Sequence, residues 1–98
     1  MKKVFISLPM KDKLRSEIIS EQAKILARVN EILGEPVILI ENYMRELYSQ
    51  KPLECLGENI KRMSEADCVA FGKGWQDARG CVIERICAEK YGLEIVEV

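Results

Sequence analysis

The chain has 98 residues, a net charge of −1 and no histidine. Its length predicts one domain over residues 1–98, with 48% hydrophobic and 32% charged residues, as in an ordinary folded protein. Positive and negative side chains are interspersed, so neither a nucleic acid polymer nor a membrane surface is indicated as a partner. A chain of this size buries only a modest core, which favours association of several copies.

The four cysteines, Cys55, Cys68, Cys81 and Cys87, form no CxxC motif, and no histidine is present to complete a mixed zinc site. The N-terminal residues do not resemble a signal peptide, and no apolar segment approaches the roughly 20 residues that span a bilayer. We therefore expect a cytoplasmic protein that needs no metal and whose reduced cysteines fill the core.

The first half of the chain predicts strand, helix and strand. Residues 4–6 form a short apolar run before Pro9, typical of a buried strand, and residues 7–14 form a loop. Apolar side chains at helical spacing then continue to Leu33, with Ser16 as a possible N-cap, unless residues 11–15 are already helical. Gly34 fits the position after the helix, and residues 37–40 are typical of a strand covered on both faces.

The second half predicts two more helices and two more strands. Residues 41–51 are ambiguous, with a helical turn expected around residues 44–48, and Pro52 fits the first position of a helix over 53–65. A third strand is expected over 67–71, a glycine-rich loop after it, a helix over 79–91 and a last strand over 93–96. Alternating strands and helices predict an α/β fold with a small parallel sheet, in the order 2-1-3-4.

In that order the sheet changes direction between its first and third strands, and ligands of open α/β sheets bind at such a point. The loops that follow these two strands are the two most unusual in the chain. Glu84 lies in the first turn of the helix after the second loop, beside its apolar face. It is either a catalytic carboxylate or an acidic residue that the helix dipole favours at this position.

The same loops hold other candidates, each with a structural alternative. Trp75 could stack on a ring and Arg79 could pair with an anion, or Trp75 covers the sheet edge and Asp77 caps the helix. Ser7, Lys11 and Arg15 suit a phosphate or form a solvated basic turn.

Two further residues are better explained by structure. Asp67 is expected to serve the turn at the opposite edge, and Cys81 belongs to the core rather than being a thiol of lowered pKa. The chain has neither GxGxxG nor GxxxxGK[ST], which argues against a dinucleotide or P-loop site.

Several of these segments also resemble a known family. Residues 4–10, residues 52–57, Ala66-Asp67, and the pattern from Gly74-Trp75 through Arg79-Gly80-Cys81 to Glu84 resemble a small family found in phages and their bacterial hosts. That family is similar to the nucleoside 2-deoxyribosyltransferases, and the resemblance covers essentially the whole chain.

The resemblance implies a flavodoxin-like (Rossmann-like) three-layer sandwich and chemistry at the N-glycosidic bond of a deoxynucleoside or its monophosphate. Glu84 would attack C1′, and water or a second base would then take the sugar. No cofactor is required. The residues implied in substrate binding are Phe5, Ser7, Pro9, Met10, Lys11, Gly74, Trp75, Arg79 and Gly80.

Two positions depart from the pattern of these enzymes. Phe5 stands where they carry a tyrosine that bonds the glutamate, and Asn59 stands where they carry an acidic aspartate. Either Glu58 or Asp77 supplies the missing acid, or activity is altered or absent. The resemblance also implies that a neighbouring subunit completes each site of a homo-oligomer. The alternatives to an enzyme are a module that binds nucleotides without turnover and an interaction protein without a ligand.

Overall fold

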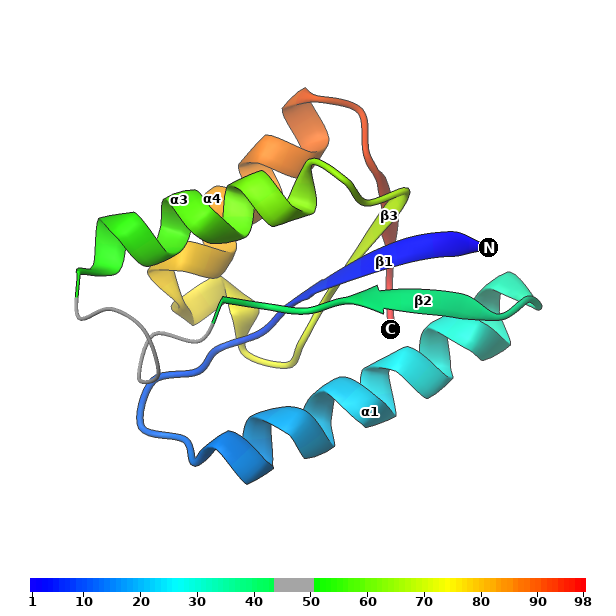
Figure 1. Cartoon of the computed structure of the whole chain (residues 1–98), viewed down its shortest axis with the longest axis horizontal. Helices are drawn as coiled ribbons and strands as arrows, with labels where there is room; N and C mark the ends of the chain where they lie inside the picture. The colour runs from blue at the N-terminus through cyan, green and yellow to red at the C-terminus, as the bar shows by residue number, and fades with distance from the viewer. Residues whose placement is uncertain (44–50) are drawn as a thin grey trace.

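A computed structural model describes residues 1–43 and 51–98. Within these ranges four strands alternate with three α-helices and one short 3₁₀ turn (Figure 1). In chain order they are β1 (Lys2–Ser7), α1 (Arg15–Leu33), β2 (Val37–Ile40), α3 (Pro52–Met63), β3 (Cys68–Phe71), the 3₁₀ turn Trp75–Asp77, α4 (Arg79–Lys90) and β4 (Glu94–Val96).

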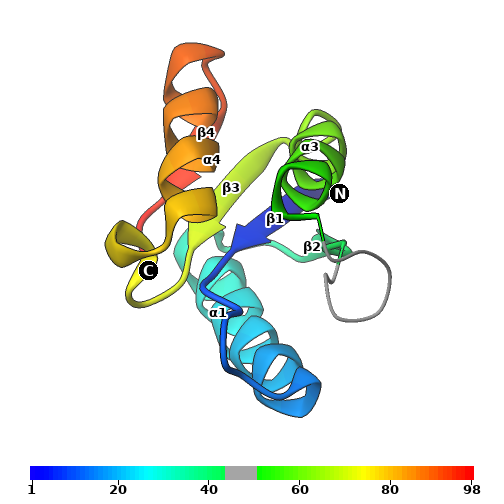
Figure 2. The same ribbon diagram turned by 90° about the vertical axis from the view of Figure 1, so that its left-hand side faces the viewer.

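The strands form one parallel sheet in the order β2-β1-β3-β4, which confirms the predicted order. In the central pair, Val4 lies opposite Cys68 and Ser7 lies opposite Phe71. Helix α1 covers one face of the sheet, and α3 and α4 cover the other (Figures 1 and 2). The chain therefore has a flavodoxin-like three-layer α/β fold, as expected.

The face under α1 is packed by alternate residues of the strands. Val4, Ile6 and Ala70 meet Ile18 and Val29 of α1, and all five side chains have no exposed surface. These two helical residues belong to the apolar stripe that the sequence places on one side of the helix. The 3.6-residue period of α1 and the two-residue period of the strands thus meet at this interface.

The opposite face packs against α3 and α4. Phe5 and Val69 are completely buried there, with Met63 from the end of α3 and Ala88 from α4. Because Phe5 alternates with Val4 and Ile6 along β1, the central strand contributes to both cores. This burial on both faces explains the continuous apolar runs of β1 and β3.

Several element boundaries differ from those expected. Strand β1 continues to Ser7, and α1 begins at Arg15, with Leu14 rather than Ser16 as its N-cap residue. The carboxylate of Glu17 accepts a hydrogen bond from the Leu14 N–H at 2.9 Å, which satisfies one free donor at this helix end. The expectation that β2 is covered on both faces is wrong, because β2 is an edge strand and Ile38 is 44% exposed.

The turn before β3 explains Asp67. Its carboxylate accepts a hydrogen bond from the Lys3 N–H at 2.8 Å, and its own N–H donates to the Lys3 carbonyl at 2.8 Å. Asp67 thus joins β1 and β3 at the amino edge of the sheet, the structural role expected for it. The helical turn predicted around residues 44–48 lies outside the described residues. Among the described helices, none is long and apolar enough to cross a membrane.

Candidate functional site

The carboxyl ends of β1 and β3 lie side by side where the order of the sheet reverses. Ser7 and Phe71 are the paired last residues of these strands. Figure 2 looks onto this edge, with the loop after β1 and the loop after β3 both turned toward the viewer. Helix α4 starts above the same edge and directs its first turns toward β1.

Glu84 is buried at this edge. The hydroxyl of Ser7 donates a hydrogen bond of 2.7 Å to Oε1 of Glu84, and the two residues are 1% and 6% exposed. Glu84 lies on the buried face of α4 together with Cys81 and Ala88, at helical spacings of three and four. The sequence places Glu84 only beside the apolar face, whereas the structure includes it in that face.

Burial changes the acidity of both titratable groups here. Loss of water around the carboxyl raises the pKa of Glu84 from 4.5 to about 7, although the hydrogen bond from Ser7 lowers it somewhat. Burial likewise raises the pKa of the Cys81 thiol to about 11, against a smaller lowering by Ser7. The alternative of a low-pKa Cys81 is therefore wrong, and Cys81 is a neutral core residue.

The loop after β3 is fixed by close contacts. A Cβ on Gly72 would lie 2.7 Å from the Leu8 Cβ, and the Gly72 N–H donates to the Ser7 carbonyl at 2.7 Å. Gly74 has a φ of +84°, which favours glycine. Only a chain without side chains at these points can follow β1 so closely. Gly72 therefore keeps the loop against the residues that follow Ser7.

Trp75 lies in this loop against Phe71, with ring centroids 5.4 Å apart. The guanidinium of Arg85 lies 4.9 Å from the Trp75 centroid and 5.1 Å from that of Phe71. It also donates to the Glu97 carboxylate at 2.7 Å. The rings, Arg85 and Glu97 form a second cluster, on the other side of the edge from β1.

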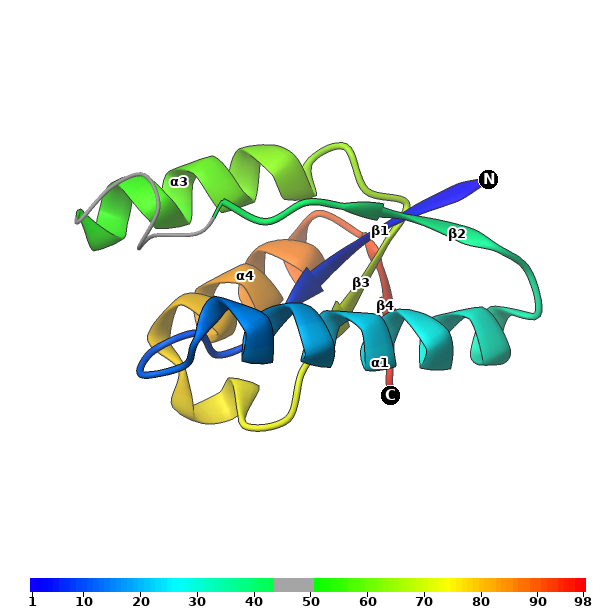
Figure 3. The same ribbon diagram turned by 60° about the horizontal axis from the view of Figure 1, so that its bottom comes forward.

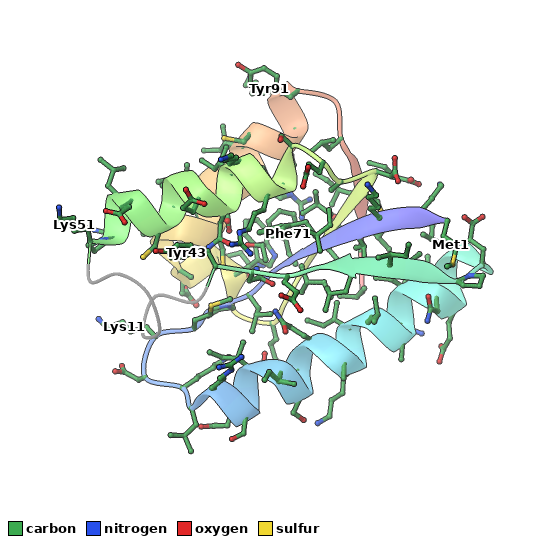
Figure 4. The ribbon with its side chains drawn as sticks, in the orientation of Figure 1. Met1, Lys11, Tyr43, Lys51, Phe71 and Tyr91 are labelled. Atoms are coloured by element: carbon green, nitrogen blue, oxygen red, sulfur yellow. The ribbon has the colours of Figure 1, made fainter. Side chains whose placement is uncertain are left out.

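Asn59 is held by the backbone after β2. Its Oδ1 accepts a hydrogen bond from the Tyr43 N–H at 2.8 Å, and its Nδ2 donates to the Tyr43 carbonyl at 3.2 Å. Figure 4 shows Tyr43 beside α3, on the same side of the molecule as Lys11 and opposite Met1. Since both atoms of the amide are occupied, Asn59 positions this segment.

A neighbouring amide pair supports the same segment. Gln22 Nε2 donates to Asn42 Oδ1 at 2.6 Å, and Asn42 Nδ2 donates to the Ile6 carbonyl at 2.8 Å. Sequence reasoning did not single out this pair, or Arg85, as functional candidates. The available signal was Gln22 itself, a polar side chain within the apolar stripe of α1.

The other predicted residues are dispersed around the edge. Phe5 has no exposed surface and so presents none to a ligand, while Pro9 lies 3.8 Å from where a Gly74 Cβ would be. Met10 packs beside the core under α1. Lys11, Arg15, Asp77 and Arg79 are exposed, and Gly80 and Glu58 are half-buried. Asp77 makes no side-chain cap to α4, whose N-cap residue is Ala78.

Trp75 and Gly74 line an open groove of about 570 Å³ between α1 and the loop after β3. A second hollow of about 330 Å³ continues it toward Lys13. Neither includes Ser7 or Glu84. Thus the structure brings Ser7 together with Glu84, and Trp75 with Gly74, but it does not place Lys11 or Arg79 beside either pair.

The described residues hold no group of three or more cysteine, aspartate or glutamate side chains placed to bind a metal ion. All four cysteines are free thiols. No family model matches the chain, and no curated protein matches it either. The resemblance to the deoxyribosyltransferases therefore stays an expectation, and the site is interpreted from its own geometry.

Proposed function

We propose that the protein cleaves or transfers the N-glycosidic bond of a deoxynucleoside or its monophosphate, with Glu84 as the nucleophile. The observation that carries the proposal is the buried pair of Ser7 and Glu84 at the point where the sheet order reverses, 2.7 Å apart. Carboxyl groups with strongly raised pKa values in such positions are more often functional than structural. The resemblance of residues 74–84 points to the same chemistry.

In this mechanism the ionised carboxylate attacks C1′ of the sugar. The C1′–N bond breaks, and the base leaves with its electron pair and takes up a proton. Water or a second base then attacks C1′ from the opposite face and releases Glu84, so that configuration is retained overall. Ser7 takes the place of the missing tyrosine hydroxyl, because it donates to the glutamate from the same strand as Phe5.

The source of the proton for the leaving base is open to direct test. Glu58 and Asp77 are the two carboxyl groups that the sequence offers near the edge, and within the described residues neither is hydrogen-bonded to Glu84. Asp77 lies in the same loop as Trp75, and Glu58 lies on α3 next to Asn59. Comparison of Glu58→Gln with Asp77→Asn would separate them by their effect on bases that leave poorly without a proton.

The first experiment incubates the pure protein with a panel of deoxynucleosides and their monophosphates, each with and without a free base. Base release and base exchange are followed by chromatography. Turnover that disappears in Glu84→Gln and persists in Glu89→Gln supports the proposal, since Glu89 is an exposed carboxyl on the same helix. Acid quenching and mass spectrometry should then find the sugar on the peptide that contains Glu84. Full turnover by Glu84→Gln would exclude the mechanism.

A second candidate is a module that binds nucleotides without turnover. The specific observation in its favour is Asn59, whose amide is fully used by the Tyr43 backbone and carries no acidic proton. This candidate predicts that a nucleotide raises the melting temperature while no product forms after long incubation. An interaction protein without a ligand would show neither effect.

A further inference from the structure

A continuous groove runs along α1 on the side away from Glu84. The two hollows of about 570 and 330 Å³ share Lys24, Ile25 and Lys73, so they form one depression. We call it the α1 groove. One wall is the middle of α1, and the other is the loop formed by residues 72–76. Figure 3 shows α1 in front of this loop, with the start of α4 behind.

The walls of the α1 groove carry unpaired positive charge. Lys24 from α1 and Lys73 from the loop have no ion-pair partner among the described residues. The acidic side chain of Glu97 also lines the groove, but it is engaged by Arg85 at 2.7 Å. Two cations from different elements thus face one space in a chain whose net charge is −1.

Trp75 forms the apolar part of the α1 groove. Its ring is half-buried and is held from one side by the Arg85 guanidinium and Phe71. The Trp75 N–H also donates to the Gly72 carbonyl at 3.2 Å, which fixes the backbone. An aromatic ring held in place before a ligand arrives costs less entropy on binding than a mobile one.

We propose that the α1 groove binds a small organic phosphate that carries a flat ring, with Lys24 and Lys73 on the phosphate and Trp75 against the ring. Cations held by two elements suit the charge of a phosphate, and a fixed indole suits a planar heterocycle. The volume falls within the range of small-molecule sites, which is roughly 300–1,000 Å³. This site is separate from Glu84 and does not rest on the proposed reaction.

Trp75 is the only tryptophan in the chain, so its fluorescence reports the α1 groove directly. We would titrate the full chain with adenosine monophosphate, adenosine and inorganic phosphate at low salt. The expected result is saturable quenching by the monophosphate, with dissociation constants at least tenfold higher for adenosine and for phosphate alone. Added salt should weaken binding, because the lysines are exposed.

Three variants test the assignment. Lys24→Ala with Lys73→Ala should raise the dissociation constant of the monophosphate at least tenfold, while the matched pair Lys61→Ala with Lys90→Ala, also exposed, should not. Glu84→Gln should bind as the natural chain does. Absence of saturable quenching, or equal binding by both lysine pairs, would overturn the proposal. Binding lost only in Glu84→Gln would overturn it as well and would place the ligand at Ser7 and Glu84.

Discussion

Ser7 and Glu84 are separated by 77 residues in the chain, yet their side chains share a buried hydrogen bond of 2.7 Å. Ser7 ends the first strand, and Glu84 lies in the second turn of the last helix. The contact exists only because β1 and β3 pair in parallel and α4 returns over them. The acidity of Glu84 therefore depends on the whole arrangement of the sheet.

The raised pKa of Glu84 predicts a specific pH dependence of the proposed reaction. A nucleophilic carboxylate must be ionised, so kcat/KM should rise about tenfold per pH unit below pH 7 and level off above it. The measurement is kcat/KM against pH for the best substrate of the panel. A profile that falls above pH 7 would assign Glu84 as a general acid instead.

Ser7→Ala should move that profile. The Ser7 hydroxyl stabilises the ionised carboxylate, so its removal should raise the pKa of Glu84 further and shift the rising limb to higher pH. Carbon-13 NMR titration of the Glu84 carboxyl measures the same shift without substrate. Ser16→Ala, an exposed serine on α1, is the control. An unchanged titration in Ser7→Ala would contradict the role given to this hydroxyl.

Glu84→Gln should stabilise the fold at high pH. The folded pKa of about 7 exceeds the ordinary value of 4.5, so the folded state binds more protons between these values. The natural chain should lose stability as pH rises from about 4.5 to 7, by up to about 3 kcal/mol. Urea unfolding should show Glu84→Gln more stable at pH 8 and equal at pH 4. Equal stability at both values would mean that Glu84 is solvated.

Gly72→Ala should destabilise the protein and disturb the site. A Cβ there would be 2.7 Å from the Leu8 Cβ and 3.3 Å from Ile25 Cδ1, so backbone must move at a cost of about 1–3 kcal/mol. Gly57→Ala is the matched control, because nothing lies within 4 Å of its Cβ in the interior of α3. It should stabilise the protein by about 0.5–1 kcal/mol. Similar melting temperatures for both variants would contradict the close approach.

Asn59→Asp tests whether position 59 supplies an acid. The carboxylate could still accept from the Tyr43 N–H, but it would face the Tyr43 carbonyl that the amide now donates to. We expect a loss of about 1–3 kcal/mol in unfolding free energy and no gain in turnover. Asn30→Asp is a poor control, because Asn30 also bonds backbone. Higher turnover in Asn59→Asp, measured at equal folded fraction, would instead assign position 59 to catalysis.

The fold could be predicted because its signals are local and agree. Apolar runs of four residues marked the inner strands, helical spacing marked α1, and right-handed crossovers then left few sheet orders. The prediction failed at β2, because a run such as Val37–Ile40 does not reveal that only one strand neighbours it. Sequence periodicity gives which side chains can be covered, and neighbours decide which of them are.

The candidate site was predicted less completely. Glu84 and Ser7 were both singled out, but for separate purposes, since nothing local indicates that one bonds the other. The roles of Asn59 and Arg85 depend on groups from distant segments, the Tyr43 backbone and Glu97. Such pairings arise from tertiary geometry, which one sequence does not contain.

The position of β1 has a consequence for how the protein forms. The first strand to leave the ribosome lies in the middle of the sheet, and at the amino edge Lys3 meets Asp67 across 64 residues. It must therefore wait for about two thirds of the chain before its inner partner exists. Sheets with such distant pairings fold slowly, because a long loop closes before any contact repays its entropy. During that interval Val4, Phe5 and Ile6 would be exposed, so nascent chains should be prone to aggregation and should benefit from a chaperone that shields this strand.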